Sequence, residues 1–284
     1  MTRIKLITIL GIVLALLVIF LGFNGRFSQR HGNAYYTVKD RWQLPFTLQE
    51  VSGIVWLGDH KVAAVQDEDG SIFIYDLKAK QVEEEIEFGD PGDYEGIAVK
   101  DADAFVLRSD GAILEINNFR DGQRTVKTYE TRFTERNNME SLAIDPDENR
   151  LLISPKDHDL DSDNFKGIYA FSLENKKLAS QPVLRIDLTD SILSRFRDND
   201  LYKTFRPSDL AIHPKSKEIY VLEGTKPKLL ILGADGNPKK AYALDKKMFP
   251  QPEGITFSPN GTLYISSEGK KDTHGTITQL EFKG

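Results

Sequence analysis

ESLAIDPDENRLLISPKD, residues 140–157, places a carboxylate before a short apolar run, then a turn rich in Asp, Pro and Asn, then a second apolar run. Four other stretches follow the same plan: SGIVWLGDHKVAAVQDEDG from Ser52, EGIAVKDADAFVLRSDG from Glu95, SDLAIHPKSKEIYVLEGT from Ser208 and EGITFSPNGTLYISSEG from Glu253. Short β-branched and aromatic runs bounded by such turns are typical of β-strands. The chain therefore contains five copies of one strand–turn–strand unit.

The spacing of the copies predicts the fold class. Their first residues are 43, 45, 68 and 45 positions apart, and a period near 45 that holds four short strands is typical of a propeller blade. We therefore expect an all-β, five-bladed β-propeller. The longest interval contains about 23 extra residues, in which apolar side chains recur at roughly helical spacing, so we expect a helical insertion at about 189–206.

The last copy predicts how the ring closes. It has room for only three strands, whereas residues 34–44 (AYYTVKDRWQL) form a strand-like run with no blade of their own. Pairing the two would remove two exposed sheet edges. We expect residues 34–44 to supply the outer strand of the last blade.

The first thirty residues predict a membrane anchor. Residues 6–23 carry no charge and are preceded by Arg3 and Lys5, and such a run is long enough to cross a bilayer core as a helix. A cleaved signal peptide is the alternative, but its apolar region is usually about 7–15 residues long, and the following GFNGRFSQR has no small-x-small site. We expect residues 1–30 to be a short cytoplasmic start with a single-pass transmembrane helix, and residues 31–284 to form the propeller outside.

Composition excludes several classes of function. The formal charge of −6 and the lack of a Lys/Arg run argue against a nucleic-acid partner, because phosphate binding needs a concentrated basic face. The chain has no Cys, which excludes disulfides, thiolate catalysis and Cys-ligated zinc.

The candidate site follows from propeller geometry. The innermost strand of each blade lines the central channel and the next strand runs antiparallel to it, so the start of the first and the end of the second meet at one mouth. Three of the five starts are Glu95, Glu140 and Glu253, which repel each other unless something neutralises them. They can share protons, pair with Arg108 and Lys156, or coordinate a hard cation such as Ca²⁺.

We predict a calcium site formed by Glu95, Glu140 and Glu253. The ligand-binding residues expected around it come from the same mouth: Arg108, Lys156, Asp209, Glu223 and Glu268. The alternative is purely structural, with each Glu capping backbone amides where a loop enters a strand.

The motifs also support a family resemblance. EVSGI, DYEGIAV, VLRSDG, NNMESLAI, LLISPKD, RPSDLAIHP and QPEGITF occur in this order, and together they resemble the SdiA-regulated family of membrane-anchored bacterial β-propellers, which are similar to NHL-type propellers. The resemblance covers nearly everything from Trp42 to Gly284. It implies a five-bladed propeller and a calcium site in the ring, and the N-terminal anchor fits it. The short N-terminus before the anchor in turn predicts a place at the inner membrane with the propeller on the periplasmic side. The resemblance implies no particular reaction.

Three functions remain open at this point. We favour a membrane-anchored binding or sensory propeller whose mouth, with its cation, receives a small anionic ligand. The first alternative is a metal-dependent hydrolase of an ester or phosphoester, in which the cation polarises a substrate oxygen. The second is a scaffold that presents its blade edges to another envelope protein.

Overall fold

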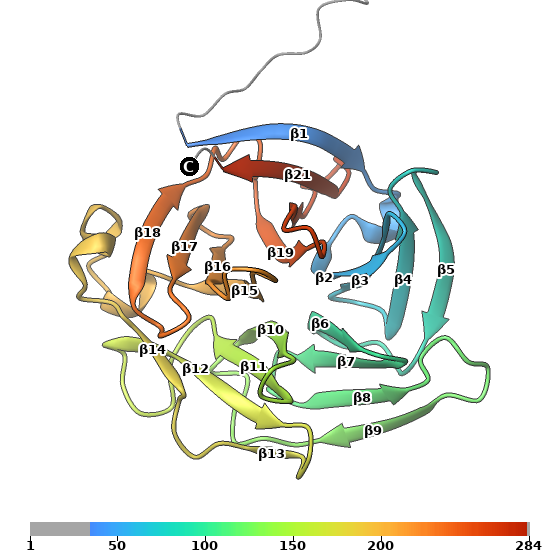
Figure 1. Cartoon of the computed structure of the whole chain (residues 1–284), viewed down its shortest axis with the longest axis horizontal. Coiled ribbons are helices and arrows are strands. Elements are labelled where there is room, and N and C mark those ends of the chain that lie inside the picture. The colour runs from blue at the N-terminus through green and yellow to red at the C-terminus, as the bar shows by residue number, and fades with distance from the viewer. Residues whose placement is uncertain (1–34, 283–284) are drawn as a thin grey trace, which may run out of the picture.

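The computed structural model describes residues 35–282, which form a ring of five blades around a central axis (Figure 1). Written from the axis outward, the first blade consists of β2 (Val51–Gly58), β3 (Lys61–Gln66), β4 (Ser71–Asp76) and β5 (Gln81–Glu87), and the second of β6 (Tyr94–Lys100), β7 (Asp103–Arg108), β8 (Ile113–Asn117) and β9 (Thr125–Tyr129). The third consists of β10 (Met139–Asp145), β11 (Arg150–Pro155) and β12 (Phe165–Ser172), and both β13 (Lys177–Leu178) and β14 (Leu184–Asp187) pair with β12. The fourth is β15 (Pro207–Ile212), β16 (Ile219–Glu223), β17 (Lys228–Leu232) and β18 (Pro238–Ala243), and the fifth is β19 (Pro252–Phe257), β20 (Leu263–Ser267), β21 (Thr276–Phe282) and β1 (Tyr36–Gln43). The predicted five-bladed propeller is confirmed.

Strand β1 closes the ring as predicted. It pairs antiparallel with β21, with Tyr36 opposite Phe282 and Gln43 opposite Thr276. We call the rim where the innermost strands begin the mouth. Because β20 ends and β21 begins at this rim, Gln43 lies at the mouth and Tyr36 at the opposite rim.

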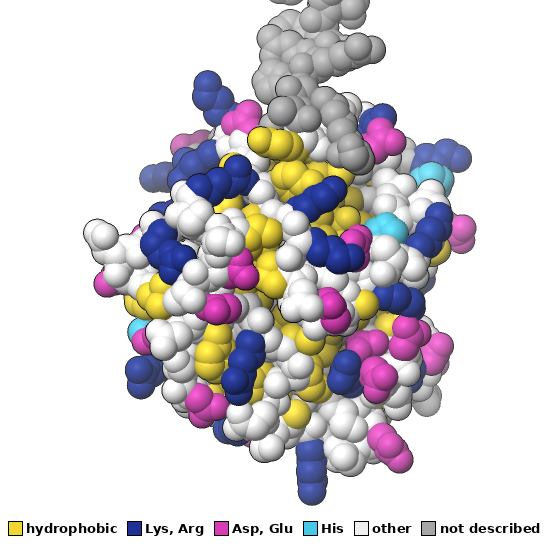
Figure 2. Space-filling model, turned by 60° about the vertical axis from the view of Figure 1, so that its left-hand side comes forward, with side chains coloured by type: hydrophobic (Ala, Val, Ile, Leu, Met, Phe, Trp, Pro, Cys, Tyr) yellow, Lys and Arg dark blue, Asp and Glu magenta, His cyan; other side chains and the backbone are white. Residues whose placement is uncertain are grey.

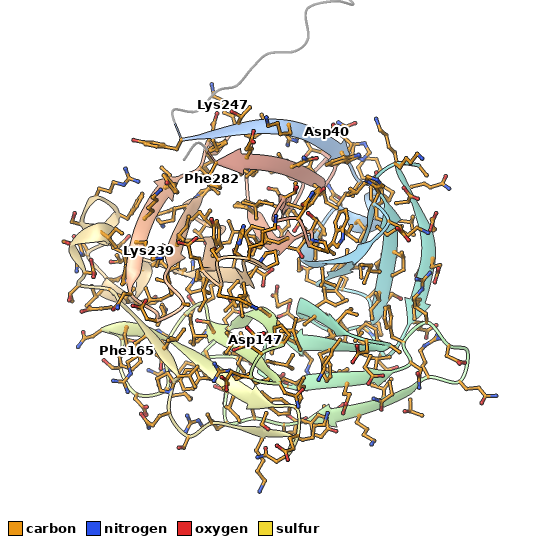
Figure 3. All side chains as sticks on the ribbon, viewed as in Figure 1. Asp40, Asp147, Phe165, Lys239, Lys247 and Phe282 are labelled. Atoms are coloured by element: carbon orange, nitrogen blue, oxygen red, sulfur yellow. The ribbon has the colours of Figure 1, made fainter. Side chains whose placement is uncertain are left out.

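The core lies between neighbouring blades, where apolar side chains of adjacent sheets pack together. Figure 3 shows how densely side chains fill the ring. The middle strand β4 is buried on both faces, whereas the outer strand β5 is largely exposed. The exterior carries charged side chains of both signs among apolar ones (Figure 2). This distribution follows from the layout, since a middle strand faces two neighbouring blades and an outer strand faces water on one side.

Glycine lets the innermost strands approach each other around the axis. A Cβ atom on Gly53 would lie 2.8 Å from the Cα of Gly96, and one on Gly254 would lie 2.5 Å from the carbonyl oxygen of Ser52. Only a residue without a side chain fits there. This explains why three of the repeated lines have Gly as their second residue.

The insertion between the third and fourth blades contains two short 3-10 helices. They are η2 (Ser191–Phe196), whose first turn is capped by Asp190 at 2.8 Å from the amide of Ile192, and η3 (Leu201–Lys203). Leu193 is fully buried against the cores of the two adjoining blades. A third short helix, η1 (Phe46–Leu48), connects β1 to β2.

The predicted membrane anchor at residues 6–23 lies outside the described residues. Across residues 35–282, none of the helices has the length and apolar character needed to span a bilayer. The anchor therefore stays a prediction.

Candidate functional site

The repeated Glu residues occupy one backbone irregularity that recurs in every blade. In the second blade Tyr94 pairs with Arg108 but Gly96 pairs with Leu107, so Glu95 is the extra residue of a β-bulge. The register shifts in the same way at the start of the other four innermost strands, β2, β10, β15 and β19. Since a bulge redirects the side chain that it carries, the same bulge in each blade turns the first side chain of the repeated unit toward the mouth.

Two of the three glutamates are buried around a lysine. The ammonium of Lys156 forms an ion pair with Glu140 Oε1 and lies 3.9 Å from Glu253 Oε1. Glu140 is 3% exposed and Glu253 is 4% exposed. The Oε2 atom of each accepts no hydrogen bond from the described residues. Each buried carboxyl group therefore retains an unused acceptor.

Burial and mutual repulsion favour the protonated form of these groups. Burial and then the charge of Glu140 raise the pKa of Glu95 well above its usual range, and burial and then Glu253 do the same for the pKa of Glu140. Burial also raises the pKa of Glu253. The pKa of Lys156 is raised too, because the nearby carboxylates outweigh the effect of its burial. The groups titrate as one coupled set in which a charged lysine is surrounded by partly protonated carboxyl groups.

The set extends along the mouth to two more carboxyl groups. Burial, reinforced by Glu253, raises the pKa of Glu268 to about 8, and burial raises the pKa of Asp67 to about 6. Glu268 accepts a hydrogen bond of 2.6 Å from the side chain of Gln251. We call Glu95, Glu140, Glu253, Glu268, Asp67 and Lys156 the carboxyl cluster.

The other predicted ligand-binding residues are engaged with the protein itself. Arg108 donates to Asp110 from Nε at 3.0 Å and from Nη2 at 2.7 Å. Glu223 forms a fully buried ion pair with Lys228 and accepts the amide hydrogen of Arg206 at 3.1 Å. The charges of Arg108 and Glu223 are therefore balanced by partners outside the carboxyl cluster.

Asp209 connects three blades. Its Oδ1 accepts from the amides of Leu210 at 2.8 Å and Leu142 at 3.2 Å, and its Oδ2 accepts from the amide of Ile255 at 2.8 Å. Both oxygens of this buried side chain therefore join β10, β15 and β19 around the axis. Its contacts are those of a structural residue.

Arg206 belongs to the mouth although the repeated pattern does not predict it. Its Nε lies 2.9 Å from Asp157 Oδ1, and its positive charge lowers the pKa of both Glu140 and Glu253 against the larger effect of burial. Asn138, likewise not predicted, donates to Glu140 Oε1 at 3.0 Å. Arg206 directly precedes β15, which begins at Pro207, and Asn138 directly precedes β10, which begins at Met139. This position before an innermost strand was the sequence signal that could have placed both residues at the mouth.

The residues around Glu140 do not form a ready metal site. Within residues 35–282 no three His, Cys, Asp or Glu side chains gather closely enough to hold a metal ion. The cation that contacts Glu140 is Lys156. Calcium binding by Glu95, Glu140 and Glu253 therefore stays a prediction, and it would require Lys156 to move aside.

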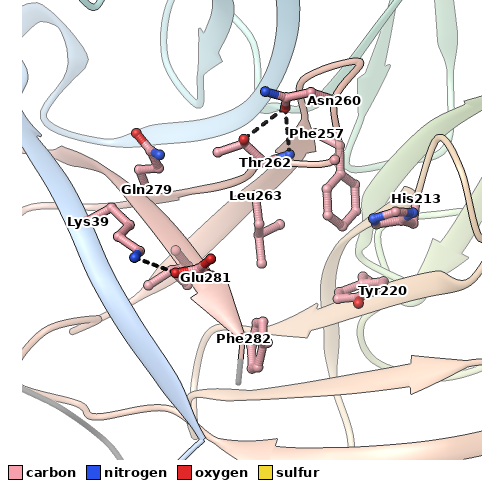
Figure 4. Close-up of a pocket in the computed structure, with 12 residues that line it drawn as sticks. Lys39, His213, Tyr220, Phe257, Asn260, Thr262, Leu263, Gln279, Glu281 and Phe282 are labelled. Atoms are coloured by element: carbon pink, nitrogen blue, oxygen red, sulfur yellow. Dashed lines mark hydrogen bonds and ion pairs between the residues drawn. The ribbon is translucent and has the colours of Figure 1, made fainter. Parts of the chain in front are cut away.

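Two further cavities lie away from the carboxyl cluster. The central channel has a volume of about 200 Å³ and is lined almost entirely by apolar side chains of the five innermost strands, including Trp56, Ile144 and Phe257. A pocket of about 520 Å³ between the fourth and fifth blades is lined by aromatic side chains, such as His213 and Tyr220, together with polar and charged ones, such as Lys39 and Glu281 (Figure 4).

Comparisons with known proteins agree with the propeller fold. The family model described as SdiA-regulated matches residues 28–271. No curated protein is similar enough to count as a relative. Three solved structures share the fold alone, at low identity. A streptogramin B lyase structure is 13% identical with a TM-score of 0.51, covering 88% of this chain and 99% of its own. The glutaminyl cyclase of Myxococcus xanthus is 14% identical with a TM-score of 0.55, covering 88% and 97%, and a luciferin-regenerating enzyme is 10% identical with a TM-score of 0.52, covering 86% and 94%.

Proposed function

The chain belongs to the SdiA-regulated family, and from this premise we propose that it is a ligand-binding propeller, tethered to the inner membrane and exposed on the periplasmic side, that recognises its ligand at the carboxyl cluster. One observation carries the proposal. Glu140 and Glu253 are buried at the mouth, and each keeps one carboxyl oxygen without a hydrogen-bond donor from the described residues. A buried acceptor without a partner costs about 1–3 kcal/mol, which a bound donor would recover.

The contacts at the mouth favour a particular ligand chemistry. Lys156 is paired with Glu140, and Arg206 is paired with Asp157. The unused groups are therefore carboxyl oxygens, which accept a hydrogen bond when the group is ionised and can donate one when it is protonated, and they suit a ligand that presents an amine, a hydroxyl group or a calcium ion. The anionic ligand expected at Arg108 and Lys156 would have to break an existing ion pair.

The hydrolase and scaffold alternatives make different demands on the mouth. A hydrolase would need a bound metal beside Glu140, so its activity would disappear with a chelator. A scaffold would lose nothing when Glu140 is changed. Both alternatives stay predictions.

The test is a thermal-shift screen of the full chain in detergent micelles with CaCl₂ and a panel of amines and sugars. A true ligand should raise the melting temperature of the wild type. Its effect should be lost in Glu140→Gln and Glu253→Gln, which keep the shape of the side chain. Glu218→Gln is the matched control because Glu218 pairs with Lys239 at 3.0 Å outside the mouth. Ligands that act equally on all three variants would contradict the proposal.

The tether is tested separately by intact-mass measurement of the protein purified from membranes. We expect the mass of the uncleaved chain, because residues 22–30 lack a small-x-small site. A mature chain that starts after residue 23 would rule out the anchor without touching the binding proposal.

A further inference from the structure

Another pocket opens on the mouth side of the fifth blade, next to the carboxyl cluster. Its volume is about 860 Å³. Three distant parts of the sequence line it: the end of β1, the connection between β18 and β19, and the loop between β20 and β21. We call it the basic pocket, and its charged or ionisable lining residues are Arg41, Lys246, Lys247, Lys270, His274 and Glu268.

Positive charge in the basic pocket is not compensated by the protein. Within the described part of the chain, Arg41, Lys246, Lys247 and Lys270 form no salt bridge, unlike Lys156 and Arg206 in the neighbouring mouth. The only carboxyl group among the residues that line the pocket is that of Glu268. Four such cations in one hollow of a chain with net charge −6 create a local field that attracts anions.

The backbone that carries the two adjacent lysines is fixed. Asp245 accepts hydrogen bonds at its carbonyl oxygen from the amides of Met248 at 2.9 Å and Phe249 at 2.8 Å, and its Oδ1 accepts from the amide of Lys247 at 2.9 Å. Phe249 is fully buried in the core between the fourth and fifth blades. The tight turn through Lys246 therefore presents both ammonium groups from a rigid support.

The other two cations are positioned as well. Gln49 donates from Nε2 to the carbonyl oxygens of Lys270 at 2.8 Å and Thr273 at 2.9 Å, which holds the loop between β20 and β21. The guanidinium of Arg41 contacts Met248 Sδ at 2.9 Å and Thr276 Oγ1 at 3.4 Å. These contacts fix the backbone below Lys270 and the guanidinium of Arg41 before any ligand arrives, whereas the exposed lysine side chains are ordered on binding.

His274 borders the pocket in a defined orientation. Its Nδ1 lies 2.8 Å from the carbonyl oxygen of Leu44, so Nδ1 carries the hydrogen, and its ring centroid lies 4.2 Å from that of Phe46. Its Nε2 makes no hydrogen bond within the described residues. In this tautomer Nε2 is an acceptor, which suits a hydroxyl group of a ligand and not a phosphate oxygen.

We propose that the basic pocket binds a soluble anion that carries at least two phosphate groups. A guanidinium and three separate ammonium groups match the charge of a diphosphate, because each phosphate monoester carries about −1.5 to −2 at pH 7, whereas a carboxylate carries only −1. The volume exceeds what a single phosphate needs. This site is distinct from the carboxyl cluster, with which it shares only Glu268 at its border.

The test uses inorganic pyrophosphate as the probe and calorimetry on the full chain in zwitterionic detergent micelles. Lys246→Gln with Lys247→Gln should weaken pyrophosphate binding by about tenfold or more, and raising salt from about 50 to about 200 mM should weaken binding to the wild type. The matched control is Lys78→Gln with Lys240→Gln, which removes the same charge at exposed positions outside the pocket. It should leave the affinity within about twofold.

Three results would overturn the proposal. The first is no pyrophosphate binding by the wild type. The second is equal loss of affinity in the pocket double variant and in the control. The third is binding only to vesicles that contain phosphatidylglycerol, which would identify a lipid surface instead of a soluble anion. Glu140→Gln separates this site from the mouth, because it should abolish the ligand effects there and leave pyrophosphate binding unchanged.

Discussion

Replacing Lys156 by Met tests whether this lysine holds the carboxyl cluster together. The ammonium pairs with Glu140 and lies 3.9 Å from Glu253, and the Lys156 side chain is 13% exposed. Removing one partner of a buried ion pair costs about 3–5 kcal/mol. Because Lys156 keeps some contact with water, we expect the lower end of this range, about 3 kcal/mol, at pH 8.

The loss should depend on pH in a defined direction. The cluster carboxyl groups already have raised pKa values when folded, and loss of the lysine raises them further. A group that binds its proton more tightly in the folded chain contributes stability at low pH, and this contribution is lost as the pH rises through the folded pKa. One extra bound proton changes the free energy of unfolding by about 1.4 kcal/mol per pH unit. The cost of Lys156→Met should therefore fall to about 1 kcal/mol or less at pH 5.5.

The assay is urea unfolding of wild type and variant at pH 5.5 and pH 8, followed by the fluorescence of Trp42 and Trp56, which pack in one core cluster. Lys239→Met is the control. Lys239 pairs with Glu218 at 3.0 Å but its side chain is 52% exposed, so its loss should cost about 0.5 kcal/mol or less at both pH values. An equal cost of Lys156→Met at the two pH values, or a cost near that of the control at pH 8, would refute the reasoning.

Three more predictions concern the ring. The pKa of Glu268 is about 8 in the folded chain, and its ordinary value is 4.5. Protonation of Glu268 therefore stabilises the fold fully below pH 4.5, and this contribution is lost as the pH rises to 8. Glu268→Gln should flatten the curve of unfolding free energy against pH between these values, as measured by urea unfolding. Asp209→Asn leaves one carbonyl oxygen to serve the amides of Leu142, Leu210 and Ile255, so it should lower the free energy of unfolding by about 1–3 kcal/mol, and an unchanged urea midpoint would contradict this. Deleting residues 1–44 removes β1 and exposes β21, so it should lower the melting temperature much more than deleting residues 1–34, and equal melting temperatures would show that β1 does not support the ring.

The fold could be predicted because the five copies repeat both their apolar runs and their turns. The closing strand was predictable for a related reason, since a three-stranded blade and an unassigned strand can satisfy each other. The bulges could not be predicted, because they lie at the first residues of the innermost strands, where too few residues precede them to reveal a change in the alternation. Four copies nevertheless have a small second residue, which indicates that the innermost strands approach each other closely there: Gly53, Gly96, Ser141 and Gly254.

The sequence could predict which residues reach the mouth, but it could not predict how they pair with each other. Which cation pairs with which carboxylate depends on local competition. Arg108 has Asp110 two residues away and pairs with it, while Lys156 has no such neighbour and reaches Glu140. Asp209 breaks the rule of a small second residue, and its side chain instead joins the innermost strands. The larger residue at this position is visible in the sequence, but only the structure shows that the Asp209 carboxylate accepts hydrogen bonds from three innermost strands.

Strand β1 also sets how the molecule would respond to force. It begins at Tyr36 on the rim opposite the mouth and ends at Gln43 on the mouth itself. If residues 1–34 hold the chain at a membrane, a pull on a ligand at the mouth would load the ring through the start of β1. The hydrogen bonds between β1 and β21 lie across the strands, so the part of the load that acts along β1 would be shared among them in shear, whereas peeling would break them one at a time. The pairing that closes the ring would therefore also carry the tether's load.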